Sequence, residues 1–273
     1  MKLYNDDCLK VLPTLESKSI DLIITSPPYD KMRTYNNSSI WNFDIFKRIA
    51  NELIRVLKDG GVIVWIVNDT TINGSETGTS FKQALYFKEI GLNLHDTMIW
   101  QKETNPFTHK NRYINIFEYM FVFSKGKPKT TNLIKDRKNK YGGTKVHGTQ
   151  REKNGTVRLP TRIGKEIKEY GSRFNVWQIN TEKQNKTNHP AVFPILLAED
   201  HIKTWSNKND TVLDCFLGSG TSGLAAQNLN RKFVGIELDK KYFEIAKNRI
   251  NENNNTLQTK SAAKLSAPDF KRL

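Results

Sequence analysis

Apolar residues form short runs that alternate with stretches in which they recur every three or four positions. Residues 62–67 are one such run, as apolar as a strand buried on both faces of a parallel sheet, and residues 20–24 are another, interrupted only by Asp21. Between them, residues 43–57 carry apolar side chains at helical spacing, and Gly60-Gly61 follows. The pattern predicts a strand, a helix ended by the two glycines, and a second strand.

The alternation continues along the chain with one interruption. The remaining expected elements are a helix over about 79–90 ended by Gly91, strands over about 94–100 and 118–123, a helix over about 190–205, a strand over 211–214, a helix to about 229, a strand over 232–237 and a last helix from about 240. This order predicts an α/β fold with a doubly wound, mainly parallel sheet. The expected parts are a first α/β half (1–124), a basic, loop-rich insertion (125–175), a second α/β half (176–250) and a polar, frayed tail (251–273).

The net charge is concentrated in one part of the chain. Lys and Arg total 43 against 28 Asp and Glu, which gives +15 at pH 7. Residues 125–188 hold seventeen of the basic residues and five of the acidic ones, so +12 of the +15 lies there. Solubility or coding bias would also raise the content of lysine. A localised excess favours a polyanion as the partner, and nucleic acid is the interpretation we prefer.

Neither export nor a membrane span is indicated. Residues 62–67 are the longest clean apolar run and are far too short to cross a bilayer, and the N-terminus lacks the apolar segment of a secretory signal. Cys8 and Cys215 have no pairing or metal-ligand spacing, so buried free thiols in a reducing cytosol are expected. The sequence therefore predicts a cytoplasmic protein without a bound metal.

A glycine-rich turn lies between the strand that ends at Asp214 and the next helix. Gly218, Gly220 and Gly223 allow the backbone to pass close to a ligand, and the helix N-terminus presents unpaired N–H groups. Glu237, at the end of the following strand, is placed to accept both hydroxyls of a ribose. The same spacing is also the fingerprint of dinucleotide-binding proteins, so a dinucleotide-dependent oxidoreductase is the rival interpretation.

Two features favour S-adenosylmethionine as the ligand of this turn. The carboxylate of Asp214 would repel a pyrophosphate, whereas it suits the amino-acid end of the methyl donor. A dinucleotide domain usually opens its chain with such a unit, but here the turn comes late. A tight turn with only a structural role would not need the aspartate, three glycines and Glu237 together.

A second candidate site follows the strand at residues 20–24. In Ser26-Pro27-Pro28-Tyr29, the two prolines fix φ, hold Ser26 extended and remove two backbone donors. The result is a rigid lip of carbonyl oxygens and one hydroxyl, which can accept both protons of an amino group. Tyr29 adds an aromatic face on which a flipped base can stack. The alternative is a Pro-Pro strand stop with a tyrosine that only packs.

These two motifs together resemble the DNA amino-methyltransferase family. The family's catalytic Asp/Asn/Ser-Pro-Pro-Tyr motif matches Ser26 to Tyr29, and Asp-x-Phe-x-Gly-Ser-Gly-Thr matches Asp214 to Thr221. In the beta class the catalytic motif comes first, a target-recognition region follows, and the cofactor motif comes last, as in this sequence. The resemblance implies a Rossmann-like methyltransferase fold with circularly permuted motif order. Residues 126–175 and the tail have no counterpart that can be placed.

The resemblance also implies site residues. The catalytic residues would be Ser26, Pro27, Pro28 and Tyr29. The residues implied to bind the cofactor, S-adenosylmethionine, are Asp7, Cys8, Thr25, His189, Pro190, Asp214, Phe216, Gly218, Ser219, Gly220, Thr221, Glu237 and Leu238. Trp100 to Lys102 and Glu118 to Lys125 match the middle of the family without a role being implied.

The implied reaction is direct methyl transfer to N4 of cytosine or N6 of adenine in double-stranded DNA. Methylation at carbon 5 would need a cysteine after a proline, whereas Cys8 and Cys215 each follow an aspartate. Serine at the first motif position is commoner among N4-cytosine enzymes, so cytosine is favoured and adenine is the alternative. A non-catalytic or RNA-directed relative is a more distant alternative. A restriction endonuclease counterpart and a second copy of the chain are candidate partners.

Candidate DNA-binding residues lie in two places. Arg33 and Tyr35, just beyond the catalytic motif, would contact phosphate or flank the flipped base, unless they belong to a solvated loop. In the insertion, the candidates for target recognition are Lys138, Lys140, Lys145, Arg151, Arg158 and Arg162. Phosphate and base contacts use the same residue types, so the sequence does not separate the two roles.

Overall fold

The computed structural model describes residues 1–28, 41–103, 110–180 and 193–266, with side chains described as far as residue 254. Its contacts divide the chain into a main unit, Met1–Asn132 with Asn175–Leu273, and a hairpin unit, Leu133–Phe174. The hairpin unit falls within the part of the sequence in which we expect an insertion. Among the described helices, none is long and apolar enough to cross a membrane.

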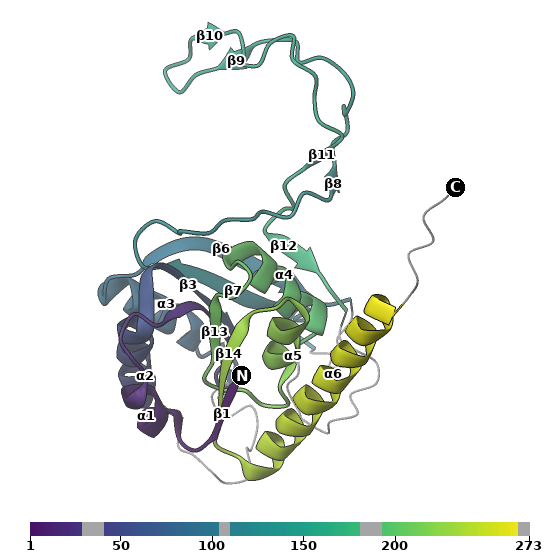
Figure 1. The fold of residues 1–273 in the computed structure, drawn as a ribbon. Helices are drawn as coiled ribbons and strands as arrows, with labels where there is room; N and C mark the ends of the chain where they lie inside the picture. The colour runs from purple at the N-terminus through teal and green to yellow at the C-terminus, as the bar shows by residue number, and fades with distance from the viewer. Residues whose placement is uncertain (29–40, 104–109, 181–192, 267–273) are drawn as a thin grey trace. The chain divides into compact units, whose positions relative to one another are not determined.

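The main unit is built on one eight-stranded sheet (Figure 1). Its order is β1 (Lys2–Asn5), β14 (Lys232–Glu237), β13 (Thr211–Asp214), β2 (Ile20–Thr25), β3 (Leu57–Val67), β7 (Phe117–Ser124), β6 (Asn93–Gln101) and β12 (Val176–Gln178). Only the pairs of β7 with β3 and with β6 are antiparallel, and the other five pairs are parallel. The prediction of a mainly parallel sheet is confirmed.

Helices cover both faces of the sheet, as the doubly wound fold requires (Figure 1). They are α1 (Cys8–Val11), the short 3-10 helix η1 (Leu12–Thr14), α2 (Phe43–Val56), α3 (Thr79–Glu89), α4 (Ile195–Trp205), α5 (Thr221–Asn228) and α6 (Lys240–Ser266). A small hairpin, β4 (Thr71–Ile72) with β5 (Ser75–Glu76), lies between β3 and α3. The α6 backbone extends beyond residue 250, where the sequence suggests that a polar tail begins.

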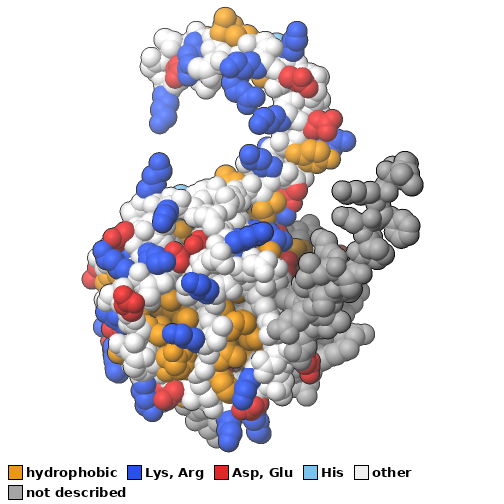
Figure 2. All heavy atoms as spheres, in the orientation of Figure 1, with side chains coloured by type: hydrophobic (Ala, Val, Ile, Leu, Met, Phe, Trp, Pro, Cys, Tyr) orange, Lys and Arg blue, Asp and Glu red, His pale blue; other side chains and the backbone are white. Residues whose placement is uncertain are grey.

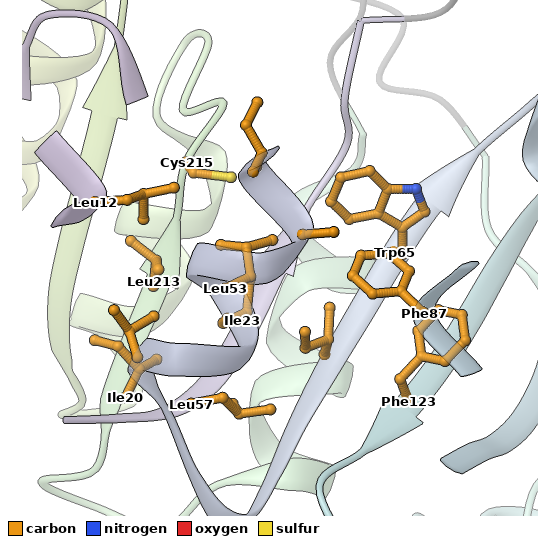
Figure 3. Packing of buried hydrophobic residues seen from close by; sticks show 14 of the residues in the cluster. Leu12, Ile20, Ile23, Leu53, Leu57, Trp65, Phe87, Phe123, Leu213 and Cys215 are labelled. Atoms are coloured by element: carbon orange, nitrogen blue, oxygen red, sulfur yellow. The ribbon is translucent and has the colours of Figure 1, made fainter. Parts of the chain in front are cut away.

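Alternation along the strands divides the core into two clusters, one on each face. On one face, Ile23 and Trp65 pack with Leu53 of α2 and Phe87 of α3, all almost completely buried (Figure 3). The indole N–H of Trp65 donates to the side-chain oxygen of Gln83 at 2.8 Å, which satisfies the polar atom of the largest buried side chain. The other face holds the second cluster, to which α4, α5 and α6 contribute. Both faces are therefore sealed, and the strand ends are left to form a site.

The prediction that Gly60-Gly61 ends a helix is wrong. Helix α2 ends at Val56, and the two glycines lie inside β3 at an irregularity in its pairing with β2. Gly60 has φ +77°, and its N–H donates to the carbonyl oxygen of Lys125 at 2.7 Å. A Cβ on Gly60 would lie 2.9 Å from the Cβ of Lys129. The glycine is needed because the chain after β7 passes against the strand.

The hairpin unit consists of two short antiparallel pairs joined by turns. They are β8 (Arg137–Lys138) with β11 (Tyr170–Gly171), and β9 (Gln150–Arg151) with β10 (Val157–Arg158). No side chain of this fully described unit is buried. Its exposed large apolar residues are Leu133, Tyr141, Val157, Leu159, Ile163, Tyr170 and Phe174. Backbone pairing and turns, rather than a hydrophobic core, therefore maintain its conformation.

Candidate functional site

The glycine turn lies where β13 ends and α5 begins. Gly218 and Gly220 both have positive φ, 54° and 86°, in the region that favours glycine. A Cβ on Gly220 would lie 2.9 Å from the Cβ of Ala246 on α6, so the turn passes directly against that helix. The hydroxyl oxygen of Thr221, the first residue of α5, is buried and has no hydrogen-bond partner among the described residues.

Asp214 ties this turn to the strand that precedes the Ser-Pro-Pro motif. One carboxylate oxygen accepts from the hydroxyl of Thr25 at 2.6 Å and from the N–H of Phe216 at 3.0 Å. The other accepts from the hydroxyl of Ser222 at 2.5 Å. Burial raises the pKa of the Asp214 carboxyl above its ordinary value, although these three hydrogen bonds oppose the rise. The two motifs, 189 residues apart in the sequence, are thus in direct contact.

Glu237 closes the other side of the glycine turn. Its carboxylate accepts from the N–H of Gly218 at 2.7 Å and from the N–H of Asp239 at 2.8 Å. Burial raises the pKa of Glu237 to about 7, although these backbone hydrogen bonds lower it. Leu238 follows it and is exposed. A group with this pKa changes charge within the physiological range.

Two residues support the turn that the sequence analysis did not identify. Asn5 is opposite Glu237 in the pairing of β1 with β14, and its amide donates to the carbonyl oxygens of Glu237 and Leu238. Arg249 of α6 donates to the hydroxyl oxygen of Ser219 at 3.0 Å. No local motif contains these two residues, because both reach the turn only through tertiary packing.

The pairing of β1 with β14 also brings Asp7 and Cys8, which follow β1, to this edge. Asp7 caps α1, and its carboxylate accepts from the N–H of Leu9 at 2.9 Å. Cys8 and Cys215 are buried free cysteines, as expected. Burial raises the pKa of Cys8 to about 12, so this thiol stays protonated at neutral pH.

The Ser-Pro-Pro motif emerges from β2 at the carboxyl edge of the sheet. Thr25 pairs with Trp65 of β3, and Ser26 follows immediately, half-buried, with Pro27 buried behind it. Phe216 of the glycine turn contacts the ring of Trp41 edge-on at 5.5 Å between centroids. Five predicted site residues lie outside the described residues, namely Tyr29, Arg33, Tyr35, His189 and Pro190.

Basic side chains dominate the hairpin unit, which carries twelve basic and four acidic residues. All six residues predicted to recognise the target, Lys138, Lys140, Lys145, Arg151, Arg158 and Arg162, are exposed. Arg158 forms an ion pair with Glu152. The hairpin unit can be found in Figure 2 by its place in Figure 1. On the face shown there, its charged side chains are mostly Lys and Arg. In the described part of the chain, no group of three or more His, Cys, Asp or Glu side chains could hold a metal ion.

Comparisons with known proteins cover most of the chain. The family model N6_N4_Mtase, described as DNA methylase, matches residues 20–248. The orphan methyltransferase M.BamHII of Bacillus amyloliquefaciens is 53% identical over 242 residues, covering 85% of this chain and 89% of that protein. The type II methyltransferase M.SmaI of Serratia marcescens is 28% identical, covering 91% and 90%.

Solved structures with the same fold include a DNA methyltransferase and a protein in complex with SAM. The cytosine-N4-specific PvuII enzyme superposes with a TM-score of 0.67 at 21% identity, covering 93% of this chain and 90% of that one. M1.HpyAVI in complex with SAM superposes with a TM-score of 0.61 at 27% identity, covering 92% and 98%. Both confirm the Rossmann-like methyltransferase architecture of the main unit.

Proposed function

Because this chain belongs to the N6_N4_Mtase family of DNA methylases, we propose that it transfers a methyl group from S-adenosylmethionine to the N4 amine of a cytosine flipped out of duplex DNA. One observation supports this most strongly. The hydrogen bond between Thr25 and Asp214 places the Ser-Pro-Pro motif beside the glycine turn, so a donor on the turn and an amine at Ser26 can meet. The protein would act in the cytoplasm, where the DNA is.

The glycine turn fits the methyl donor. The buried hydroxyl of Thr221 and the N–H groups at the start of α5 are suited to a carboxylate, and Asp214 to an ammonium group. Glu237 is suited to the ribose hydroxyls, with Asp7, Cys8, Phe216 and the segment at His189 and Pro190 completing the cofactor site. S-adenosylmethionine supplies an electrophilic methyl group on a sulfonium. M1.HpyAVI, a relative with the same fold, has been solved with this cofactor.

Ser26 would act on the acceptor. Its hydroxyl oxygen and the adjacent carbonyl oxygen accept the two amine protons, which directs the nitrogen lone pair toward the methyl group. Pro27 and Pro28 keep these acceptors in place because their φ angles are fixed. Tyr29 would stack on the flipped base. Serine in the first motif position favours cytosine, and N6 of adenine is the second candidate because its amine presents the same two protons.

Duplex DNA is the proposed substrate, and the alternatives of RNA or of binding without catalysis are tested together with it. Radiolabelled S-adenosylmethionine is incubated with the chain and with equal masses of duplex DNA or structured RNA of mixed sequence. We expect label in the DNA alone. Label in the RNA would overturn the substrate, and cofactor binding without transfer to either would overturn the activity. An endonuclease of the same specificity and a second copy of the chain are proposed partners.

The hairpin unit is proposed to bind DNA phosphates and to contribute to target recognition, together with Arg33 and Tyr35. Replacing Lys138, Lys140 and Lys145 with glutamine is expected to weaken DNA binding and to lower the slope of log K against log salt by roughly 0.9 for each phosphate that the variant no longer neutralises. Fluorescence anisotropy with a labelled duplex at several salt concentrations measures this slope.

A matched control removes the same charge elsewhere. Lys88, Lys208 and Lys232 are exposed on the main unit, and their triple glutamine variant should retain most of the salt dependence. Equal slopes for the two triple variants would show that only net charge matters and would contradict a binding role for the hairpin unit.

Cofactor affinity is expected to rise with pH between about 6 and 8. The pKa of Glu237 is raised to about 7, so much of this carboxyl is protonated at the lower end of that range. Only the carboxylate accepts from both ribose hydroxyls, so binding expels the proton and the affinity rises by at most about tenfold per pH unit below the pKa. Calorimetric titration with S-adenosylmethionine measures the effect. Glu237→Gln should lose most of it, while Glu244→Gln, exposed on α6, should keep it. An unaltered pH profile in Glu237→Gln would rule out this role.

A further inference from the structure

A row of polar residues continues beyond Ser26 along the carboxyl edge of the sheet. In β2, β3, β7 and β6, alternate residues such as Ile24 and Ile66 belong to the same core cluster on one face. Continuing that alternation to the edge gives one polar residue on each strand, in the order of the sheet: Ser26, Asn68, Glu118 and Lys102. The cofactor turn lies on the other side of Ser26, on β13 and β14. The proposed cofactor site therefore assigns no role to Asn68, Glu118 or Lys102.

Lys102 and Glu118 form a close ion pair in this row. The Lys102 nitrogen lies 2.5 Å from a Glu118 carboxylate oxygen, with the two side chains 25% and 9% exposed. The same nitrogen lies 4.8 Å from the centroid of the Trp100 ring, which is itself fixed by a hydrogen bond to the carbonyl oxygen of Ile179. The side-chain amide of Asn68 holds the start of β7 by donating to the carbonyl oxygen of Phe117 at 3.0 Å. The lysine is thus held in one orientation.

The pair has features that a purely structural role does not require. Withdrawing two charges from water costs free energy, and an apolar pair of the same volume often serves stability as well. Lys102 has three N–H donors, and its partners among the described residues are Glu118 and the face of Trp100. At least one donor therefore has no partner in the part of the chain that the structure describes, and it can serve a ligand that enters at this edge.

The position of the pair matches the ring of the acceptor base. The methyl group must lie between the donor on the β13 side and the amine at Ser26, so the ring extends over β3 and β7. Strands β2 and β7 are two places apart, which separates their backbones by about 10 Å. Lys102 follows β6, but its nitrogen lies against Glu118 of β7. A pyrimidine ring with a hydrogen bond at each end fits that span.

We propose that Lys102, oriented by Glu118, donates hydrogen bonds to the acceptor edge of the flipped base beside its amine, N3 and O2 in cytosine. This rests on the proposed function and extends it to base selection. Cytosine presents two neighbouring acceptors there, which suits an ammonium with more than one donor. Adenine presents N1 alone, next to a C–H. Glu118 is a positioning residue, because it acts through Lys102.

The test is a double-mutant cycle in which a variant of Lys102 is combined with an analogue of the target base, and KM is measured for each combination. A duplex carrying the site mapped from methylated DNA is made with cytosine or with 3-deazacytosine, in which a C–H replaces N3, at the target position. Lys102→Met should raise KM for the cytosine duplex about tenfold, a loss typical of a hydrogen bond to a charged group, with kcat changed by less than about threefold. On 3-deazacytosine the same variant should change KM by less than about threefold, because N3, one of the two acceptors of Lys102, is already gone.

Two further variants separate this role from folding. Lys58 pairs with Asp21 at 2.8 Å near the start of β2, so Lys58→Met removes a comparable ion pair from the opposite edge and should leave KM unchanged. Glu118→Gln leaves the charge of Lys102 in place but removes the ion pair that orients its side chain, and this variant should raise KM less than Lys102→Met does. Unfolding temperatures are measured for all variants.

If Lys102→Met raises KM by the same factor on cytosine and on 3-deazacytosine, the two changes act independently and the proposal is overturned. A wild-type enzyme with the same KM for both duplexes would also overturn it. The wild-type arm with the analogue needs no variant, so a poorly folded Lys102→Met leaves the test intact. If the product is N6-methyladenine, the cycle is run with 1-deazaadenine, and lack of coupling there overturns the proposal. A wild-type chain that methylates no DNA refutes the proposed function instead.

Discussion

Replacing Ser26 with alanine is expected to lower kcat for methyl transfer by roughly 10²-fold or more, the usual cost of removing one preorganised group at a reacting centre. The hydroxyl is proposed to accept a proton of the target amine, and this acceptor matters most as the nitrogen becomes positively charged. S-adenosylmethionine should bind the variant within about twofold of its wild-type affinity, because Asp214 and Glu237, which are proposed to hold its ammonium group and ribose, belong to β13 and β14 and not to the Ser26 segment. Single-turnover transfer and calorimetric titration give the two quantities.

Ser19→Ala is the matched control. Ser19 lies just before β2, and its hydroxyl donates to the carbonyl oxygen of Glu16 in an exposed turn. This variant should transfer methyl groups at the wild-type rate. A Ser26→Ala variant with wild-type kcat would remove Ser26 from the mechanism, and a matching loss of cofactor affinity would assign it to cofactor binding.

Asp214→Asn is expected to raise the Kd for S-adenosylmethionine by roughly 10- to 100-fold, since a charge-assisted hydrogen bond to the ligand's ammonium becomes a neutral one. The hydroxyl of Ser222 can turn from donor to acceptor toward the new amide NH2, while the amide oxygen still accepts from Thr25 and from the N–H of Phe216, so the variant can keep all three hydrogen bonds of the turn. The neutral-sulfur product S-adenosylhomocysteine should lose affinity by the same factor, because it has the same amino-acid end.

Asp210→Asn controls for the loss of one aspartate near β13. Its carboxylate accepts from the backbone N–H of Asn207 before the strand begins, away from the carboxyl edge. Cofactor affinity should be unchanged in this control, and thermal unfolding of both variants reports on damage to the fold. Unchanged affinity in a folded Asp214→Asn variant would contradict the assignment of this residue to the ammonium group.

The pattern of apolar residues predicted the elements whose position is decided mainly by the burial of their side chains. The strand Thr211–Asp214 and the helix Thr79–Glu89 follow their apolar period because both are buried on defined faces. Gly60 did not follow its pattern, because it lies inside β3 and does not end a helix. This glycine serves the close passage of Lys129, a contact between segments far apart in the sequence.

The candidate site shows the same limit. Asp214 and Glu237 could be identified because glycine spacing and strand ends place them together. Asn5 and Arg249 could not, since a four-residue strand and a polar helix carry no signal of the turn that they contact. Lys102 and Glu118 become a pair only through the register of β6 with β7.

The most direct measurement of the central claim is the chemical identity of the product. The purified chain is incubated with mixed-sequence duplex DNA and S-adenosylmethionine labelled in its methyl group, and the DNA is digested to nucleosides for mass spectrometry, with Ser26→Ala in parallel. The proposed function predicts labelled N4-methylcytosine that is lost in the variant. Labelled N6-methyladenine would contradict the choice of base, and 5-methylcytosine, or no labelled nucleoside despite bound cofactor, would contradict the proposed function.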